Sequence, residues 1–175
     1  RIVHGIPGDL VIKDGDVVSI DCGAIVGGLN SDMAHTAVVG ASDAVKDALV
    51  EATLVSLEKG IAQARPGARV GDISNAVEKE VLTLGYDVVR EYTGHGIGRS
   101  LHEPPQVPNF GQPDQGPLLR AGMVLAIEPM VVVGGWQTKV LDDEWTVVTA
   151  DGGLSAHFEH TVAITEDGPE VLTAL

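Results

Sequence analysis

Two aspartates in strand-like surroundings are the first residues of this sequence that are suited to chemistry. Asp21 lies in SIDCGAIV and Asp32 in NSDMAHTAVV, on either side of Gly27-Gly28, a pair that predicts a tight hairpin turn. In an antiparallel hairpin centred midway between Val26 and Gly27, the two side chains lie opposite or nearly opposite on one face, provided that the register holds. Two like charges so close are unfavourable without a cation, so the pair predicts a metal site.

Two glutamates form a second mirrored pair. Glu128 lies in VLAIEPMVV and Glu159 in AHFEHTVAI, at equal distances from a point between Asp143 and Glu144, where the sequence resembles a turn. Nested hairpins around this point would bring the glutamates side by side. A single carboxylate in such a position is more often a charge at a strand end or edge, but two mirrored pairs together favour a metal site.

Two histidines share one long stretch rich in glycine and proline, TGHGIGRSLHEPPQVPNFGQPDQGP. Such a loop in a compact domain is usually functional, and the glycines beside His95 allow backbone and ligand to approach closely. A lone loop histidine is more often a surface residue, but His95 and His102 beside the carboxylate pairs favour chemistry. Four carboxylates and one histidine suit two divalent ions rather than a closed thiolate zinc site. Two ions about 3.5–4 Å apart would hold and ionise a water for hydrolysis.

Hydrophobic periodicity and the positions of capping and turn residues predict the helices and strands that position these residues. Ser42 is expected to cap a helix that runs to about Gln63, and a second helix is expected over residues 70–84, ended by Gly85. Strands are expected over residues 17–22, 33–39, 87–92, 123–133, 138–141, 145–149 and 155–165. A carboxylate-bearing hairpin before the helices and a carboxylate-bearing β unit after them hint at two related halves.

Composition narrows the class of protein. The chain has 175 residues, which favours one domain, and a formal charge of −14, which argues against binding to DNA or RNA. Cys22 is the only cysteine, which rules out an internal disulfide and fits a reducing compartment. No apolar run reaches the ~20 residues of a membrane span. The chain opens at Arg1 beside strand-like sequence, so a segment upstream of it is expected.

Taken together, the motifs resemble the type I methionine aminopeptidases of bacteria. The matching stretches cover essentially the whole chain: VHGIP at 3–7, SIDCGAIVGG at 19–28, Asp32, GHGIGRSLHE at 94–103, AIEPM at 126–130, DEWTVVTADG at 143–152 and SAHFEHTVAIT at 155–165. The resemblance implies an α+β pita-bread fold, with antiparallel sheets, helices on the outer face and pseudo-two-fold halves. It also implies that residues 1–175 form a single catalytic domain that lacks the N-terminal segment of full-length relatives.

The resemblance implies roles for individual residues. Five residues would be ligands of a dimetal centre, with the second and the last bridging the ions: Asp21, Asp32, His95, Glu128 and Glu159. Glu128 would also carry protons from the attacking water to the leaving amine. His102 would stabilise the tetrahedral intermediate, and His4 would lie near the scissile amide nitrogen. Trp145 would help to wall the pocket for the methionine side chain.

The implied activity is removal of the N-terminal methionine from nascent proteins and peptides by an enzyme with two divalent ions (Co, Mn, Fe or Zn). The implied setting is cytoplasmic, as a monomer with peptide substrates and the ribosome as partners. Two positions depart from the family pattern. Ser31 stands where a glycine usually precedes the second aspartate, and Leu101 stands where a bulkier aromatic residue is often found.

Two other hypotheses stay open at this point. GHGIG alone also fits the related prolidases and aminopeptidases P, which cleave before proline, although HGIP and IEPM favour the methionine reading. A non-catalytic pita-bread module that binds a partner is the third hypothesis. Such modules typically lose metal ligands, whereas this chain has all five.

Overall fold

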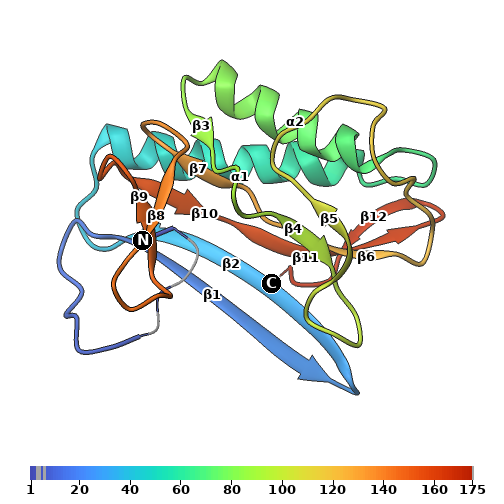
Figure 1. Ribbon diagram of the computed structural model, residues 1–175, viewed down its shortest axis with the longest axis horizontal. Coiled ribbons are helices and arrows are strands. Elements are labelled where there is room, and N and C mark those ends of the chain that lie inside the picture. The colour runs from blue at the N-terminus through green and yellow to red at the C-terminus, as the bar shows by residue number, and fades with distance from the viewer. Residues whose placement is uncertain (3–4, 6, 175) are drawn as a thin grey trace.

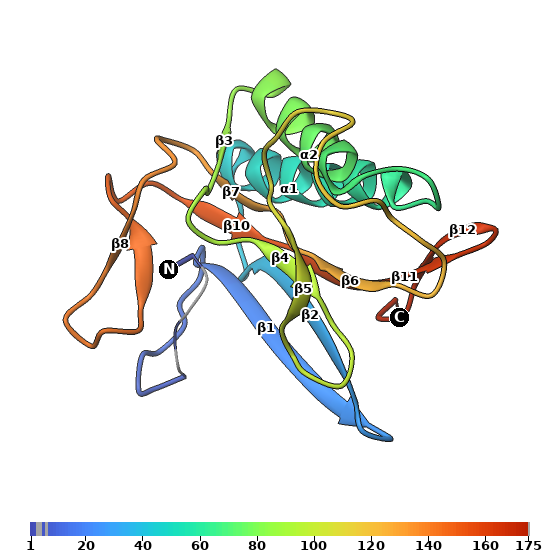
Figure 2. The same ribbon diagram turned by 45° about the vertical axis from the view of Figure 1, so that its right-hand side comes forward.

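A seven-stranded antiparallel sheet forms the framework of the computed structural model, which describes residues 1–2, 5 and 7–174 (Figures 1 and 2). Along the sheet the order is β1-β2-β11-β6-β4-β5, and β12 pairs with β11. Its strands are β1 (Val17–Val26), β2 (Leu29–Val38), β4 (Gly94–Gly96), β5 (Glu103–Val107), β6 (Val124–Ile127), β11 (Glu159–Thr165) and β12 (Gly168–Val171). A second sheet has three strands, β3 (Asp87–Val88), β7 (Met130–Val132) and β10 (Ser155–His157). A third sheet pairs β8 (Thr138–Val140) with β9 (Val147–Thr149).

Two helices, α1 (Ala44–Gln63) and α2 (Val70–Thr83), lie together on one side of the sheet (Figure 1). Leu57 and Ile73 of the helices pack with strand residues, among them Ile127, in the main hydrophobic core. Because side chains alternate across a strand, Glu128 and Glu159 lie on the opposite face, away from the helices. The expected α+β class, with antiparallel strands and helices on an outer face, is confirmed. No helix in the described part of the chain is long and apolar enough to cross a membrane.

The β1–β2 hairpin turns at Gly27 and Gly28, whose φ angles are 60° and 81°, as the tight turn requires. Asp21 pairs with Ala34, and Asp32 pairs with Gly23. The hairpin is therefore centred midway between Gly27 and Gly28, one position later than the mirror axis expected from the sequence. The two aspartates lie diagonally rather than directly opposite, but on the same face of the sheet.

The chain between β6 and β11 forms one long hairpin of nested ladders. Ile127 pairs with His160, Met130 with His157, and Thr138 with Thr149. All three ladders are centred between Asp143 and Glu144, as the mirrored glutamates predict. Breaks at Glu128-Pro129 and at Phe158 divide the ladder between two sheets, so the expected strands 123–133 and 155–165 are each split in two.

Several local expectations were wrong. Asp43, not Ser42, caps α1, because its carboxylate accepts hydrogen bonds from the amides of Val45 and Lys46. Residues 93–117 are not one irregular loop, since they contain β4 and β5. The strand expected over 87–92 is limited to β3, the one expected over 145–149 begins at Val147, and β12 had no prediction.

Candidate metal centre

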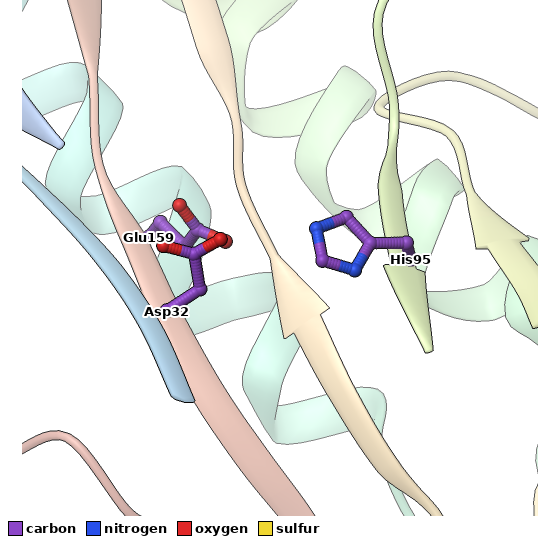
Figure 3. A group of neighbouring side chains, drawn as sticks. All are labelled: Asp32, His95 and Glu159. Atoms are coloured by element: carbon purple, nitrogen blue, oxygen red, sulfur yellow. The ribbon is translucent and has the colours of Figure 1, made fainter. Parts of the chain in front are cut away.

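Donor atoms from three separate strands converge on the face of the sheet away from the helices. Asp32 of β2, His95 of β4 and Glu159 of β11 each place one donor atom within 4.8 Å of the other two (Figure 3). In Figure 3 the two carboxylates lie next to each other and the imidazole ring faces them from across the sheet. Glu159 also belongs to a second triad of the same size, formed with Glu128 and His157.

The second triad contains two buried atoms that the described part of the chain does not satisfy. His157 Nε2 and Glu159 Oε1 are shielded from solvent and have no hydrogen-bond partner there. A buried polar atom without a partner costs about 1–3 kcal/mol, so a pair of them in one cluster needs a reason. Oxygen and imidazole donors around a shared carboxylate suit a divalent ion. The residues present therefore fit a bound metal.

The electrostatics of the cluster point in the same direction. Burial, together with the nearby carboxylates of Glu128, Asp32 and Asp21, raises the pKa of the Glu159 carboxyl to about 10. Partial burial also raises the pKa of Asp21 to about 6, with Asp32 and Glu128 adding to the shift and His157 opposing it. Asp21 lies at the exposed rim of the cluster, outside both triads but hydrogen-bonded to Asp32. A cation would remove the repulsion that these shifts reflect.

His95 is oriented by its own strand. Its Nδ1 lies 2.9 Å from the carbonyl oxygen of Gly96, which can only accept, so Nδ1 carries the proton. That leaves the lone pair on Nε2, the nitrogen that faces the carboxylates at 3.7 Å from Glu128 Oε1. A Cβ at Gly94 would collide with the carbonyl of Ala126, and one at Gly96 with that of Pro104. The flanking glycines thus admit the neighbouring strands, rather than a ligand as the sequence suggested.

Polar side chains hold the backbone of the donor residues. The hydroxyl of Thr161 accepts from the amide of Asp32 and donates to its carbonyl, at 2.8 Å in both cases. The hydroxyl of Thr36 makes the same two contacts with His157, at 2.9 and 2.7 Å. Asn109 Nδ2 donates to the carbonyl of Glu128 at 2.9 Å. These hydrogen bonds therefore fix the backbone of Asp32, His157 and Glu128, whose side chains supply donor atoms to the cluster.

His102 lies beside the donor cluster. Its ring is edge-on to that of His95, with 4.3 Å between centroids, and the side chain is exposed. A pocket of about 430 Å³ opens next to the two rings, lined by Thr93, His95, His102, Glu103, Pro104 and Gln106. His102 therefore joins the wall of this pocket to His95 of the donor cluster.

Two other residues singled out from the sequence, Trp145 and Ser31, lie outside the two donor triads. Trp145 lies in the turn between β8 and β9, with 50% of its surface exposed, and its amide donates to Asp143 Oδ1. Its role as a pocket wall stays a prediction. His4 lies outside the described residues. Ser31 pairs with Ala24 as a regular residue of β2, so this departure from the family pattern does not interrupt the hairpin.

Sequence reasoning missed His157. The motif SAHFEHTVAIT was recognised, but only its Glu159 was given a role. The signal was present, because residues two apart on an extended chain face the same side. His157 is 1% exposed and lies 3.4 Å from Glu128, so it is as deeply placed in the cluster as any expected ligand.

Fold and site together define a metal-dependent hydrolase, and the comparison with known families agrees. The model of metallopeptidase family M24 matches residues 1–166. The chain belongs to this family and is a metallopeptidase that uses divalent metal.

The chain is similar in sequence and in structure to proteins named methionine aminopeptidase. A methionine aminopeptidase of Clostridium perfringens is 54% identical over 175 residues, which is 100% of this chain and 70% of that protein. The crystal structure of a methionine aminopeptidase of Thermotoga maritima superposes with a TM-score of 0.97 at 50% identity, covering 99% of this chain and 70% of the other. The resemblance stated from the motifs is confirmed.

A prolidase of Pyrococcus horikoshii shares the fold more distantly. Its TM-score is 0.78 at 28% identity, over 99% of this chain and 44% of that one. The expected pita-bread fold is thereby confirmed, and the methionine aminopeptidases are the nearer of these two groups in both sequence and structure.

Proposed function

We propose that this chain is a methionine aminopeptidase, which hydrolyses the peptide bond after an N-terminal methionine. The observation that carries the proposal is the pair of donor triads that share Glu159, set beside the exposed imidazole of His102. The similarity to named methionine aminopeptidases over the whole chain supports the choice of substrate. Residues 1–175 act as one catalytic domain, and the named relatives extend beyond the part that they share with this chain.

Two divalent ions would be held by five side chains: Asp21, Asp32, His95, Glu128 and Glu159. When bound, such ions polarise a carbonyl group and lower the pKa of water. Mn, Fe, Co and Zn all tolerate this donor set, and availability decides between them. The clustering of the donor atoms and the unpartnered, buried Oε1 of Glu159 support this assignment.

The chain's own residues handle the protons and the substrate. Glu128 takes a proton from the attacking water and passes it to the leaving amine, since its carboxylate is buried within the cluster. His102 donates a hydrogen bond to the substrate carbonyl oxygen as negative charge develops on it. Trp145 contributes to the wall of the methionine pocket, and His4 lies near the scissile nitrogen.

The substrates are peptides and nascent chains with an N-terminal methionine. Nascent chains are made in the cytoplasm, so we place the enzyme there, in the neighbourhood of the ribosome. That it acts as a monomer stays a prediction.

The test uses the purified full-length protein, including any residues of the natural polypeptide outside residues 1–175. After EDTA treatment and addition of Mn²⁺ or Co²⁺, we expect release of methionine from Met-Ala-Ser and no cleavage of Ala-Pro-Ser. Cleavage of Ala-Pro-Ser alone would favour a prolidase-like peptidase. Absence of bound metal in elemental analysis would favour a non-catalytic module. Bound metal without methionine release would overturn the proposal.

A further inference from the structure

The carboxylate of Glu128 lies between two imidazole rings. Its Oε1 is 3.7 Å from His95 Nε2, and its Oε2 is 3.4 Å from His157 Nε2. We propose that His157 is a positioning residue: its Nε2–H hydrogen-bonds Glu128 Oε2 and keeps Oε1 turned toward His95 and the metal. The inference rests on the proposed function, because it assumes that Glu128 is a metal ligand and proton carrier.

The backbone of His157 is held on two sides, and the residue is buried. Its side chain is 1% exposed, and β10 pairs it with Met130 of β7. On the other side its amide and carbonyl are both bound by the hydroxyl of Thr36. In this position a ring nitrogen of His157 lies inside the cluster, within 4.8 Å of carboxylate oxygens of Glu128 and Glu159.

The nearest acceptor for that nitrogen is the carboxylate of Glu128. Nε2 of His157 has no hydrogen-bond partner in the described part of the chain, and a shift of a few tenths of an ångström would bring it into hydrogen-bond range of Oε2. A proton on Nε2 makes this contact attractive, whereas a lone pair facing the carboxylate would be repelled. Donation to Oε2 therefore explains the placement better than ligation of a metal by His157.

The consequence for Glu128 is a carboxylate fixed at both ends. Asn109 holds its backbone carbonyl, and His157 would hold the oxygen that does not face His95. Hydrogen bonds to a ligating carboxylate fix its orientation, and their loss typically costs about 10–100-fold in metal affinity or activity. Glu128 has to present one oxygen to a metal and exchange protons, so a loose carboxylate would impair both tasks.

The test compares two substitutions of His157 in the full protein. His157→Gln keeps an N–H donor, whereas His157→Met keeps a similar volume without one. We expect His157→Met to weaken Mn²⁺ binding to the metal-free protein in calorimetry by about 10–100-fold and to lower kcat with little change in KM. We expect His157→Gln to restore most of both. His160→Met is the matched control, since this half-buried histidine bonds Thr173 and faces the other side of β11.

A spectroscopic readout separates hydrogen bonding from ligation. In the Co²⁺ protein, each coordinated imidazole contributes a strongly shifted, exchangeable N–H signal in proton NMR. One such signal, from His95, is expected in the wild type and in His157→Gln. Two signals, one of which disappears in His157→Gln, would overturn the inference in favour of a ligand role.

Two other results would also overturn it. One is a His157→Met protein that binds metal and turns over like the wild type. The other is a folded His157→Gln protein as impaired as His157→Met, with folding judged from circular dichroism and urea unfolding. Failure of the wild type to bind metal would instead overturn the proposed function, and this inference with it.

Discussion

The hydroxyl of Thr161 makes two hydrogen bonds with the backbone of Asp32, one as donor and one as acceptor. Thr161 directly follows the two-residue ladder in which Glu159 and His160 of β11 pair with β2. A threonine side chain thus continues the pairing where the backbones no longer do. Because Asp32 and Glu159 are proposed metal ligands, this contact keeps the two carboxylates in register.

Thr161→Val tests this contact, since valine has nearly the same shape but no hydroxyl. The amide and carbonyl of Asp32 lose their partner, so we expect the free energy of unfolding to fall by about 1–3 kcal/mol. We also expect weaker Mn²⁺ binding, because Asp32 is no longer fixed relative to Glu159. Urea unfolding and calorimetry measure the two effects. Thr165→Val is the control: its hydroxyl donates to the carbonyl of Gly168 across the turn between β11 and β12, so the substitution should affect stability alone.

Asp32→Asn should abolish both metal retention and turnover. A neutral amide cannot bridge two cations, although it preserves the size and the backbone contacts of the residue. Elemental analysis after gel filtration measures retained metal, and methionine release measures turnover. Asp167→Asn, in the exposed turn before β12, is the matched control and should behave as the wild type. Full metal content in Asp32→Asn would contradict the assignment of Asp32 as a metal ligand.

His102→Ala should separate substrate contact from metal binding. The ring of His102 lies beside that of His95 but in neither donor triad, so metal content should stay unchanged. Loss of one donor to the developing oxyanion should lower kcat by about 10²–10³-fold. Elemental analysis and steady-state kinetics on the same preparation check both parts. If the substitution strips the metal, His102 belongs to the donor set.

The metal-free protein should lose stability as pH rises. The pKa of Glu159 is about 10 in the folded protein and about 4.3 in an unfolded chain. The folded state therefore binds the extra proton between these values. Stability is fully present below pH ~4.3 and falls by up to about 1.4 kcal/mol per pH unit as pH rises toward 10. Asp21, with its pKa raised to about 6, adds to the fall at the acidic end of this window.

Urea unfolding of the EDTA-treated protein from pH 6 to 9 measures this slope. Glu159→Gln should flatten it and should be more stable than the wild type at pH 8, because glutamine is neutral without the proton that Glu159 must take up on folding. Glu166→Gln, in an exposed turn, should leave it unchanged. Added Mn²⁺ should remove the fall in the wild type and should change little in Glu159→Gln, whose stability already varies little with pH. A metal-free wild type whose stability rises with pH over this range would contradict the reasoning.

The hairpins were predictable because their signals are local. Gly27-Gly28 and the alternating apolar residues determine the first turn and the shared face of Asp21 and Asp32. The centre was misplaced by one position because Asp21 and Asp32 were taken as mirror positions, whereas Gly27 and Gly28 themselves occupy the centre of the turn. The second hairpin was placed correctly, since its mirrored glutamates and the turn at Asp143 agree.

Other features depend on partners distant in sequence. β4 and β5 form in a stretch of glycines and prolines because Gly94 and Gly96 let β6 and β5 approach closely, which no local propensity reveals. The cap of α1 was misplaced by one residue because Ser42 and Asp43 are both good capping residues. His157 was missed although its spacing from Glu159 places both on one face, because its contact with Glu128 joins residues about thirty positions apart.

The nested ladders between β6 and β11 also bear on how this part of the chain can change over evolutionary time. Glu128 and Glu159 face each other because equal numbers of residues separate them from the tip of the hairpin. Paired insertions or deletions, one on each arm, would lengthen or shorten the arm that carries β8 and β9 without moving either glutamate. An unpaired change would need a bulge to absorb it. Homologous sequences should therefore differ in the outer arm by equal changes on its two strands, while the spacing around Glu128 and Glu159 stays constant.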